Sequence, residues 1–323
     1  MLAFVARRLL LSAFLIFGLL TLVFFVSHWA PGDPLQAYVQ PDVDPALLQQ
    51  LATRFGLDQP LHVQYGRWLR AFLLELDFGF SIAKHRSVRS LVFDALPHTL
   101  RLAFWAFALR LVLGVVCGIV AAVRRGTPTD VGLGVGALLF YSTPSFWLGL
   151  MLLLVFAWEL RWLPSGHVAS LDAAALPLFS RWWDGFRHLL LPVVVLGVGG
   201  AASMLRFMRA GMLEVLSQDY IRAARARGLR ERRVILRHAL RNALLPVVTL
   251  AGLSIPALLS GTIVVESLFA WPGIGRLTLE AIEQRDYPVI MATTFLSGVT
   301  AVLGTLLADV AASWLDPRLR PHS

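Results

Sequence analysis

The chain has 323 residues, of which 57% are hydrophobic and only 15% carry a charged side chain. Soluble domains average about 45–50% apolar and about 25% charged residues, so this composition indicates a membrane protein. The formal net charge of +9 is also typical of nucleic-acid-binding proteins, which carry a basic patch on a folded soluble domain. The long apolar runs leave little room for such a domain. We therefore expect the lipid bilayer, and no nucleic acid, as a partner.

The first apolar run, Leu9 to Trp29, follows Arg7 and Arg8. A basic start followed by an apolar stretch is also typical of a cleaved signal peptide. This run is long for a signal peptide, and cleavage at Ala30 would place His28 where a small residue is needed. Its length suits the roughly 30 Å hydrocarbon core, so we interpret the run as a retained transmembrane helix.

Five further membrane spans are expected, near residues 98–123, 131–158, 188–208, 244–268 and 289–313. Arginines flank alternate ends of the spans: Arg7 and Arg8, Arg124 and Arg125, the eight arginines from Arg222 to Arg241, and Arg318 and Arg320. Short loops rich in arginine and lysine are retained on the cytoplasmic side. The alternation predicts an all-α integral membrane protein with six transmembrane helices and both termini in the cytoplasm.

Residues 30–96 form the longest segment expected outside the cytoplasm. The sequence APGDP at 30–34 predicts a turn that ends the first helix. Asp44-Pro45 predicts the start of a short helix that ends before Gly56, and a second helix is expected from Asp58 to Leu76. Together these elements predict a small helical cap. The shorter outer loop, 159–187, is rich in tryptophan and proline. In or directly beside it are Trp158, Trp162, Trp182 and Trp183, and tryptophan is typical of the membrane–headgroup interface.

Small residues and prolines within the spans predict local packing features. Gly132, Gly134 and Gly136 follow no strand, so they predict close helix approach and no dinucleotide site. Pro144 and Pro256 interrupt spans three and five, either as kinks that gate a path or as static packing kinks. The single cysteine, Cys117, is interpreted as a packing residue, and no cysteine–histidine cluster predicts a metal site.

The arginine-rich segment predicts two helices joined by a bend. Asp219 is expected to cap a short helix from Tyr220 to about Arg227. Gly228 then fits the position after the helix end, where a left-handed backbone favours glycine. The second helix begins near Arg230, and its predicted apolar face comprises Ile235, Leu236, Ala239, Leu240, Ala243 and Leu244.

From these residues alone two interpretations stay open. The segment either lies on the anionic inner leaflet, stabilised by about 1 kcal/mol per arginine, or forms a docking helix for a cytosolic partner. Ala223 and Ala224 are small enough to let another surface come close, and Pro246 marks the entry into span five. His238 and Asn242 are i, i+4 neighbours and can bond each other or the backbone of a partner.

The segment DYIRAARARGL (219–229) followed by RHALRNALLP (237–246) resembles the cytoplasmic loop of binding-protein-dependent ABC importer permeases. More narrowly, it resembles the first permease subunit of the dipeptide/oligopeptide and nickel branch. The resemblance covers nearly the whole chain, through LAFVARRLL (2–10), APGDP (30–34), FGLDQPLHVQYGRWL (55–69), RRGTPTD (124–130), TPSFWLGL (143–150), VVESLFAWPGIGRL (264–277), RDYPVI (285–290) and LDPRLR (315–320). The family's loop carries Glu-Ala-Ala, and here Arg222 stands at the glutamate position. That departure weakens the general motif and favours the peptide branch.

This resemblance implies the type I ABC importer transmembrane fold and a coupling helix that sits in a groove of an ATP-hydrolysing subunit. The residues it assigns to the coupling loop are Asp219, Arg222, Ala223, Ala224, Arg227, Gly228, His238, Asn242 and Pro246. It also implies a bacterial inner membrane location. The implied partners are a second homologous permease subunit, two ABC ATPase subunits and an extracytoplasmic substrate-binding protein. ATP-driven closure of the ATPases would then move the docked loop and switch the spans between two states.

The sequence contains no nucleotide-binding or catalytic motif of the common types. A P-loop needs a glycine-lysine pair, but the only lysine, Lys84, follows an alanine. The chain also contains no HExxH and no GxSxG motif, which argues against the alternative of a membrane-embedded hydrolase. We therefore expect a transport subunit that is not an enzyme and needs no cofactor or metal.

Three charges are expected within or near the membrane: Arg110 in span two, Glu266 near the outer end of span five and Asp309 in span six. Each either lines the translocation path or has a structural role, as a helix-end or snorkelling side chain. Few acidic residues occur near the bilayer midplane, and no inverted repeat is evident. Both features disfavour the alternative of an ion-driven secondary carrier.

The predicted domains are residues 1–95 (first transmembrane helix and cap), residues 96–313 (transmembrane domain, with a coupling loop at about 211–246) and a cytoplasmic tail, 314–323. The predicted cargo is a dipeptide or oligopeptide, coupled to ATP hydrolysis through residues 219–246. Nickel, glutathione and other small solutes remain alternatives, since members of the same branch carry them and much selectivity lies in the binding protein.

Overall fold

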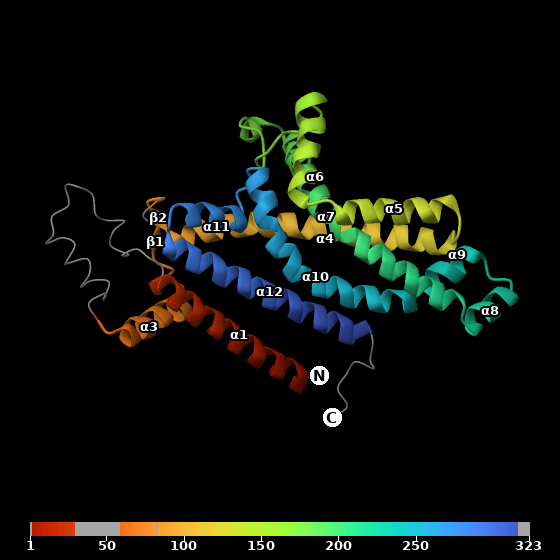
Figure 1. Ribbon diagram of the computed structural model, residues 1–323, viewed down its shortest axis with the longest axis horizontal. Coiled ribbons are helices and arrows are strands. Elements are labelled where there is room, and N and C mark those ends of the chain that lie inside the picture. The colour runs from red at the N-terminus through yellow and green to blue at the C-terminus, as the bar shows by residue number, and fades with distance from the viewer. Residues whose placement is uncertain (1, 30–58, 82, 316–323) are drawn as a thin grey trace. The chain divides into compact units, whose positions relative to one another are not determined.

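The computed structural model describes residues 2–29, 59–81 and 83–315, which are almost entirely helical (Figure 1). The expected helix from Asp44 and the expected turn at 30–34 lie outside the described residues. The described residues divide into two compact units: 2–98 with 273–299, and 99–272 with 300–315. The domain boundaries at residues 95 and 313 stay predictions.

The unit of residues 2–98 and 273–299 combines long helices with a short hairpin. Its elements are α1 (Leu2–Trp29), α3 (Leu61–Arg70) with its π-helical continuation η2 (Ala71–Glu75), β1 (Phe80–Ser81), β2 (Arg86–Ser87), the beginning of α4 (Val88–Val123), α11 (Ile274–Glu283) and the beginning of α12 (Tyr287–Leu315). The two strands pair antiparallel, with Phe80 opposite Ser87. The predicted helix entered through Pro60 is confirmed, and it ends before Leu76, whose φ is +50°.

Polar contacts fix the hairpin of this unit onto α11 and the turn after it. The Ser81 hydroxyl donates to Asp286 at 2.5 Å, and the Lys84 ammonium lies 2.5 Å from Glu280. Arg276 donates to the other oxygen of Glu280 at 2.7 Å. Burial raises the pKa of Glu280, but the hydrogen bonds from Lys84 and Arg276 outweigh it and hold that pKa below its ordinary value. The hairpin is therefore held by charge-assisted bonds.

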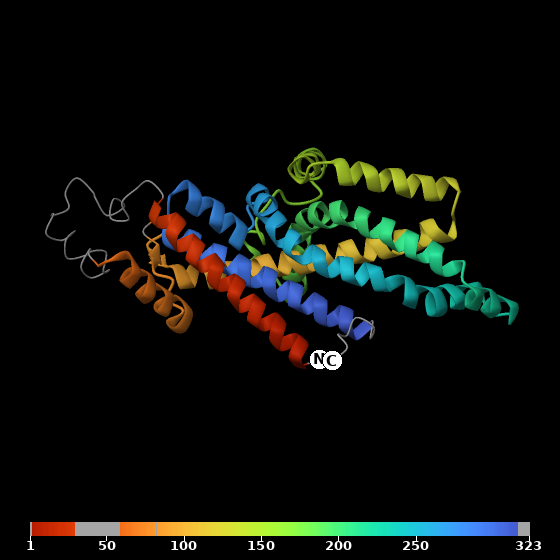
Figure 2. The same cartoon turned by 60° about the horizontal axis from the view of Figure 1, so that its bottom comes forward.

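The unit of residues 99–272 contains the longest helices. Its elements are the remainder of α4, α5 (Pro128–Ser142), α6 (Ser145–Leu152) with its π-helical continuation η3 (Leu153–Glu159), the 3₁₀ turn η4 (Ala173–Ala175), α7 (Leu178–Leu216), α8 (Asp219–Ala226), α9 (Glu231–Arg233), the π-helical η5 (Val234–Ala239) and α10 (Leu240–Leu268). Helices α7 and α10 lie side by side, as two views show (Figures 1 and 2).

The described residues contain five helices long and apolar enough to cross a membrane. Helix α5 and the α6–η3 helix together are long and apolar enough for a sixth span, although their axes are bent by 103° at the junction. The span predicted near residues 131–158 is thus interrupted at Pro144, as the proline predicted. Thr143 is extended and Pro144 begins α6, because proline disfavours the helical conformation in the residue before it. Helix α10 in contrast continues through Pro256.

Close helix approach occurs at different glycines from those expected. A Cβ atom added at Gly114 would lie 2.4 Å from Met204 Cβ, and one at Gly118 would lie 2.6 Å from Met208 Cβ. These glycines let α4 pack tightly on α7. At Gly132, Gly134 and Gly136 nothing in the described chain lies within 4 Å of an added Cβ. Within this chain the prediction of close approach at those three residues is wrong, since the pattern of small residues does not say which face meets a neighbour.

Candidate functional site: the arginine-rich bend between α7 and α10

The arginine-rich segment forms a bent excursion between two long helices. Helix α7 ends at Leu216, α8 follows after two residues, and the chain returns through α9 and η5 directly into α10. Figure 1 shows α8 beyond the ends of α7 and α10, connected to both. Helix α8 is thus joined to two long helices through short connections.

The bend itself follows the prediction. Helix α8 ends at Ala226, Arg227 is its C-cap, and Gly228 has φ +75°. This left-handed conformation costs glycine little and other residues more, which explains the glycine. The predicted N-cap is wrong: Gln218 holds that position, and Asp219 is the first helical residue. Asp219 forms an ion pair with Arg222 one turn later, on the exposed face.

One face of α8 is buried against the rest of its own unit. Ile221 and Ala224 are almost completely buried in an apolar cluster whose other members are Ala122, Met208, Met212, Val234, Ala239, Ala243 and Val247. Ala224 therefore packs inward and is not open to a partner. Ala223 and Arg222 lie on the exposed face, with Arg227 beyond the end of the helix. Of the two alanines, only Ala223 leaves a shallow, accessible position for another protein.

The helix after the bend packs most of its predicted apolar face inward: Ala239 and Ala243 are buried, and Ile235, Leu240 and Leu244 pack against the same cluster. Its buried positions are Val234, Ala239, Ala243 and Val247, and Leu236 is exposed. Val234 and Ala239 are five residues apart and both buried, because η5 is π-helical and its turn holds one residue more than an α-helical turn. A regular α-helical pattern predicted Leu236 on the apolar face and missed Val234.

Two side-chain contacts tie the bend together. The Arg225 guanidinium donates to both oxygens of Glu231, at 2.7 and 3.2 Å, so the pair spans Gly228. The hydrogen bond to Glu231 raises the pKa of Arg225 above its ordinary value. The Asn242 amide donates to the Tyr220 hydroxyl at 2.8 Å and joins α10 to α8. The bend is therefore stabilised by the buried apolar cluster around Ile221 and Ala224, by the Arg225–Glu231 ion pair and by the Asn242–Tyr220 hydrogen bond.

The remaining predicted residues of the segment lie nearby. His238 is half-buried in η5, and in the described chain its ring makes no hydrogen bond, to Asn242 or to any other residue. Pro246 is exposed in the second turn of α10. Neither residue touches a group that would explain a chemical role.

An ion pair next to the segment was missed in the sequence. Arg209 of α7 donates through two nitrogens to Asp130 of α5, both at 2.7 Å, and Asp130 also accepts from the Gly126 N–H. The Asp130 side chain is 8% exposed, so a bidentate partner is needed to stabilise its charge. Residues 79 positions apart give no sequence signal for this pair.

The charges considered for a translocation path have identifiable surroundings. Arg110 reaches α7, where it donates to the Leu196 carbonyl at 3.2 Å, and Gly200 makes room for its guanidinium. Its Nε is buried without a partner in the described chain. Glu266 is fully buried and accepts from Thr99 at 2.7 Å. The side chain of Asp309 lies outside the described residues. A path role for these three stays a prediction.

Comparisons with known proteins cover the whole chain. Residues 114–321 match the model of the family "Binding-protein-dependent transport system inner membrane component", and residues 1–103 match the model of the N-terminal region of such membrane components. The chain is 40% identical to the oligopeptide transport system permease protein AppB of Bacillus subtilis (strain 168), over 99% of each chain. It is 38% identical to the glutathione transport system permease protein GsiC of Escherichia coli (strain K12), again over 99% of each.

The fold is similar to that of a solved structure. A chain from inward-facing conformations of the MetNI methionine ABC transporter matches with a TM-score of 0.55 at 18% identity, over 70% of this chain and 96% of that one. At this identity the likeness concerns the arrangement of helices alone.

Proposed function

The chain belongs to the family of binding-protein-dependent transport system inner membrane components, and from this membership we propose that the exposed face of α8 docks to an ATPase subunit and couples its motion to transport. The protein is a multi-pass permease subunit of an ABC importer in the inner membrane, and it is not itself an enzyme. The family implies ATPase and substrate-binding protein partners.

One observation carries the docking proposal: α8 has one face buried in its own unit and another face free. The buried face, with Ile221 and Ala224, fixes the helix to α7 and α10. The free face offers Ala223 between arginines. A side chain this small lets a partner's surface approach the helix backbone, and Arg222 and Arg227 can pair with acidic or carbonyl groups around it.

The same rigidity suggests how motion passes to the membrane helices. Helices α7 and α10 pack along their length, and an added Cβ at Gly211 of α7 would lie 3.2 Å from the Ala243 carbonyl of α10. With the Arg225–Glu231 and Tyr220–Asn242 contacts, α8 and the adjacent ends of α7 and α10 move as one body. Alternating access then requires that the ATPases hold this body differently in their two states.

The orientation and assembly belong to the same proposal. We place the arginine-rich bend and both termini in the cytoplasm, because arginine-rich short loops are retained there. The chain pairs with a second, homologous permease subunit, and residues 211–246 form the coupling loop of a transmembrane domain that begins near residue 96. Coupling residues on this surface are Asp219, Arg222, Ala223, Arg227 and Gly228. Ala224 anchors α8 in the apolar cluster and Asn242 bonds Tyr220, while His238 and Pro246 belong to the same coupling loop.

The proposed cargo is a dipeptide or oligopeptide. Curated relatives over the full length are named for oligopeptide and dipeptide transport, while the relative named for glutathione transport supports that peptide-like molecule as the second candidate. Uptake of labelled dipeptides, tripeptides and glutathione, compared between cells with and without the gene, tests the cargo.

The docking proposal is tested with Ala223→Trp. The bulky ring projects outward and should leave the chain folded, but it should abolish copurification of the ATPase subunits coexpressed with the chain. Ala174→Trp is the matched control: it adds the same side chain at an exposed alanine of η4 and should leave copurification intact. If Ala223→Trp retains the ATPases at the control level, α8 is not the docking helix. Its arginines then serve another surface, such as the lipid leaflet.

A further inference from the structure

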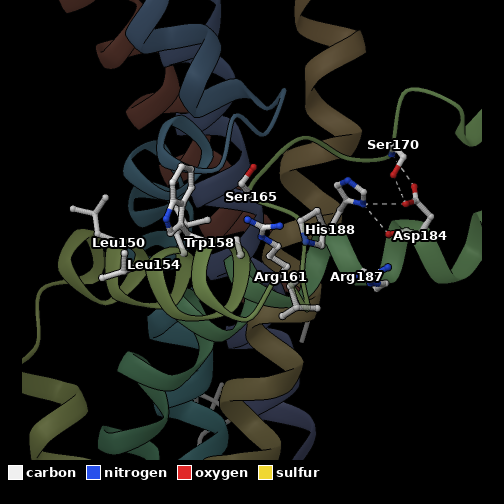
Figure 3. A pocket seen from close by; sticks show the side chains of 13 residues that line it. Leu150, Leu154, Trp158, Arg161, Ser165, Ser170, Asp184, Arg187 and His188 are labelled. Atoms are coloured by element: carbon white, nitrogen blue, oxygen red, sulfur yellow. Dashed lines mark hydrogen bonds and ion pairs between the residues drawn. The ribbon is translucent and has the colours of Figure 1, made fainter.

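A cavity of about 670 Å³ lies where η3, the loop after it and the beginning of α7 meet. All of its lining residues belong to the unit of residues 99–272. Figure 3 shows side chains from the η3 helix on one side and from the beginning of α7 on the other, with Arg161 between Trp158 and His188. The cavity lies apart from α8 in the chain, and nothing in the docking of an ATPase uses it.

The walls of this cavity differ in chemistry. The α6–η3 side is apolar, with Leu150, Leu153, Leu154 and Ala157. The loop and α7 side carries polar groups, among them Arg161. A ligand that fills the space must therefore combine an apolar part with a polar one.

The charged groups of the polar wall that still have hydrogen-bonding capacity are the arginines Arg161 and Arg187. The carboxylate of Asp184 is already engaged: it accepts from the Ser170 N–H at 2.8 Å and from the Ser170 hydroxyl at 2.6 Å, and it lies 3.5 Å from His188 Nδ1. Arg187 donates to the Trp162 carbonyl at 2.5 Å and has further N–H groups. Arg161 has no hydrogen bond or ion pair to any residue that the structure describes. An anionic group is thus the complement of this wall.

The surroundings place the cavity at a membrane boundary. Beside it in the chain, the first turns of α7 expose an apolar groove of about 380 Å³ formed by Leu178, Phe179, Trp182, Trp183 and Phe186. Trp158 on the rim of the cavity is 75% exposed and Trp182 is 81% exposed. Exposed tryptophans and phenylalanines adjoining arginines are typical of the level where lipid headgroups meet acyl chains.

We propose that this cavity binds one anionic phospholipid. Its phosphate accepts hydrogen bonds from Arg161, with Arg187 close by, and its acyl chains lie along Leu150 and Leu154. The bound lipid fills the space between η3 and the beginning of α7 and so fixes the loop between them. This inference rests on the membrane location of the chain and is independent of the docking of α8, of the cargo and of which leaflet the site faces.

The test is native mass spectrometry of the detergent-purified transporter, titrated with phosphatidylglycerol and with phosphatidylcholine. We expect phosphatidylglycerol to bind more tightly. Arg161→Asn should weaken its binding roughly fivefold, as expected for one arginine near the membrane surface. Asparagine removes the charge and tolerates the left-handed backbone of this residue, whose φ is +53°. Arg161→Lys should retain most of the binding.

Arg181→Ala is the control, because Arg181 is an exposed arginine of the same region that does not line the cavity. It should bind phosphatidylglycerol as the unaltered protein does. Glycerol 3-phosphate, added as a competitor, distinguishes a lipid site from a site for free phosphate. The proposal is overturned if Arg161→Asn leaves phosphatidylglycerol binding unchanged, if phosphatidylcholine binds equally well, or if glycerol 3-phosphate displaces the lipid at equal concentration. Loss of ATPase copurification in Ala223→Trp without loss of lipid binding would leave this proposal standing.

Discussion

Gly228 offers the sharpest test of the bend after α8. Its φ is +75°, and a Cβ added there would meet no heavy atom within 4 Å. Gly228→Ala therefore creates no clash, and its cost comes from the backbone alone. A left-handed conformation costs an L-residue about 1–2 kcal/mol, which changes an equilibrium constant by a factor of about 5–30.

The assay is hydrogen exchange of the amides that close the bend. The Gly228 N–H donates to the Arg225 carbonyl at 2.9 Å, and the Leu229 N–H donates to the Ala224 carbonyl at 3.4 Å. In Gly228→Ala, exchange of the Leu229 amide should accelerate by about 5- to 30-fold, since the bend opens more often. Gly228→Asn should accelerate it less, because asparagine tolerates this conformation. Substrate uptake should fall in the same order.

Gly126 provides the matched control. It has φ +77°, it also has nothing within 4 Å of an added Cβ, and it lies in the turn between α4 and α5. Gly126→Ala should carry the same backbone cost and leave substrate uptake unchanged. Equal loss of uptake in both variants, or exchange in Gly228→Ala within twofold of the unaltered chain, would refute the reasoning.

Three further predictions concern the stability of the full chain, each measured as a thermal midpoint in detergent. Asp130→Asn should lower the thermal midpoint, because Arg209 loses the carboxylate that accepts two of its hydrogen bonds. The exchange of both charges, Asp130→Arg with Arg209→Asp, should restore part of the loss, and no recovery would contradict a pairwise role. The pKa of Glu280 is lower in the folded chain than its ordinary value of 4.5. The ionised Glu280 therefore stabilises the folded chain fully above pH 4.5, and this contribution is lost as the pH falls through the folded pKa. A Glu280→Gln variant should lack this part of the pH dependence of the midpoint, and a profile equal to that of the unaltered chain would contradict the role of Glu280. Gly118→Val should destabilise by about 1–3 kcal/mol through overpacking, whereas Gly134→Val should have little effect because an added Cβ there meets open space.

Local chemistry explains which features were predictable from the sequence. Long apolar runs and flanking arginines predict the membrane helices, because burial in hydrocarbon depends on composition over about twenty residues. Gly228 predicts the left-handed bend, since the conformational preference belongs to the residue itself. The motifs from residue 2 to residue 320 predict the family, which the comparisons confirm. Even the break at Pro144 has a local cause, although its 103° angle could not be predicted from that cause alone.

Contacts between distant residues were decided only by the tertiary structure. Val234 is buried and Leu236 is exposed because the π-helical turn of η5 holds one extra residue, which rotates the side chains before the turn about the helix axis relative to those after it. Likewise, composition cannot distinguish Ala224, buried against α7, from Ala223, which remains free. The pairing of Asp130 with Arg209 depends on how α5 packs on α7. The sequence by itself determined which segments form long apolar helices and where the chain bends after α8, while packing determined which face of each helix is buried.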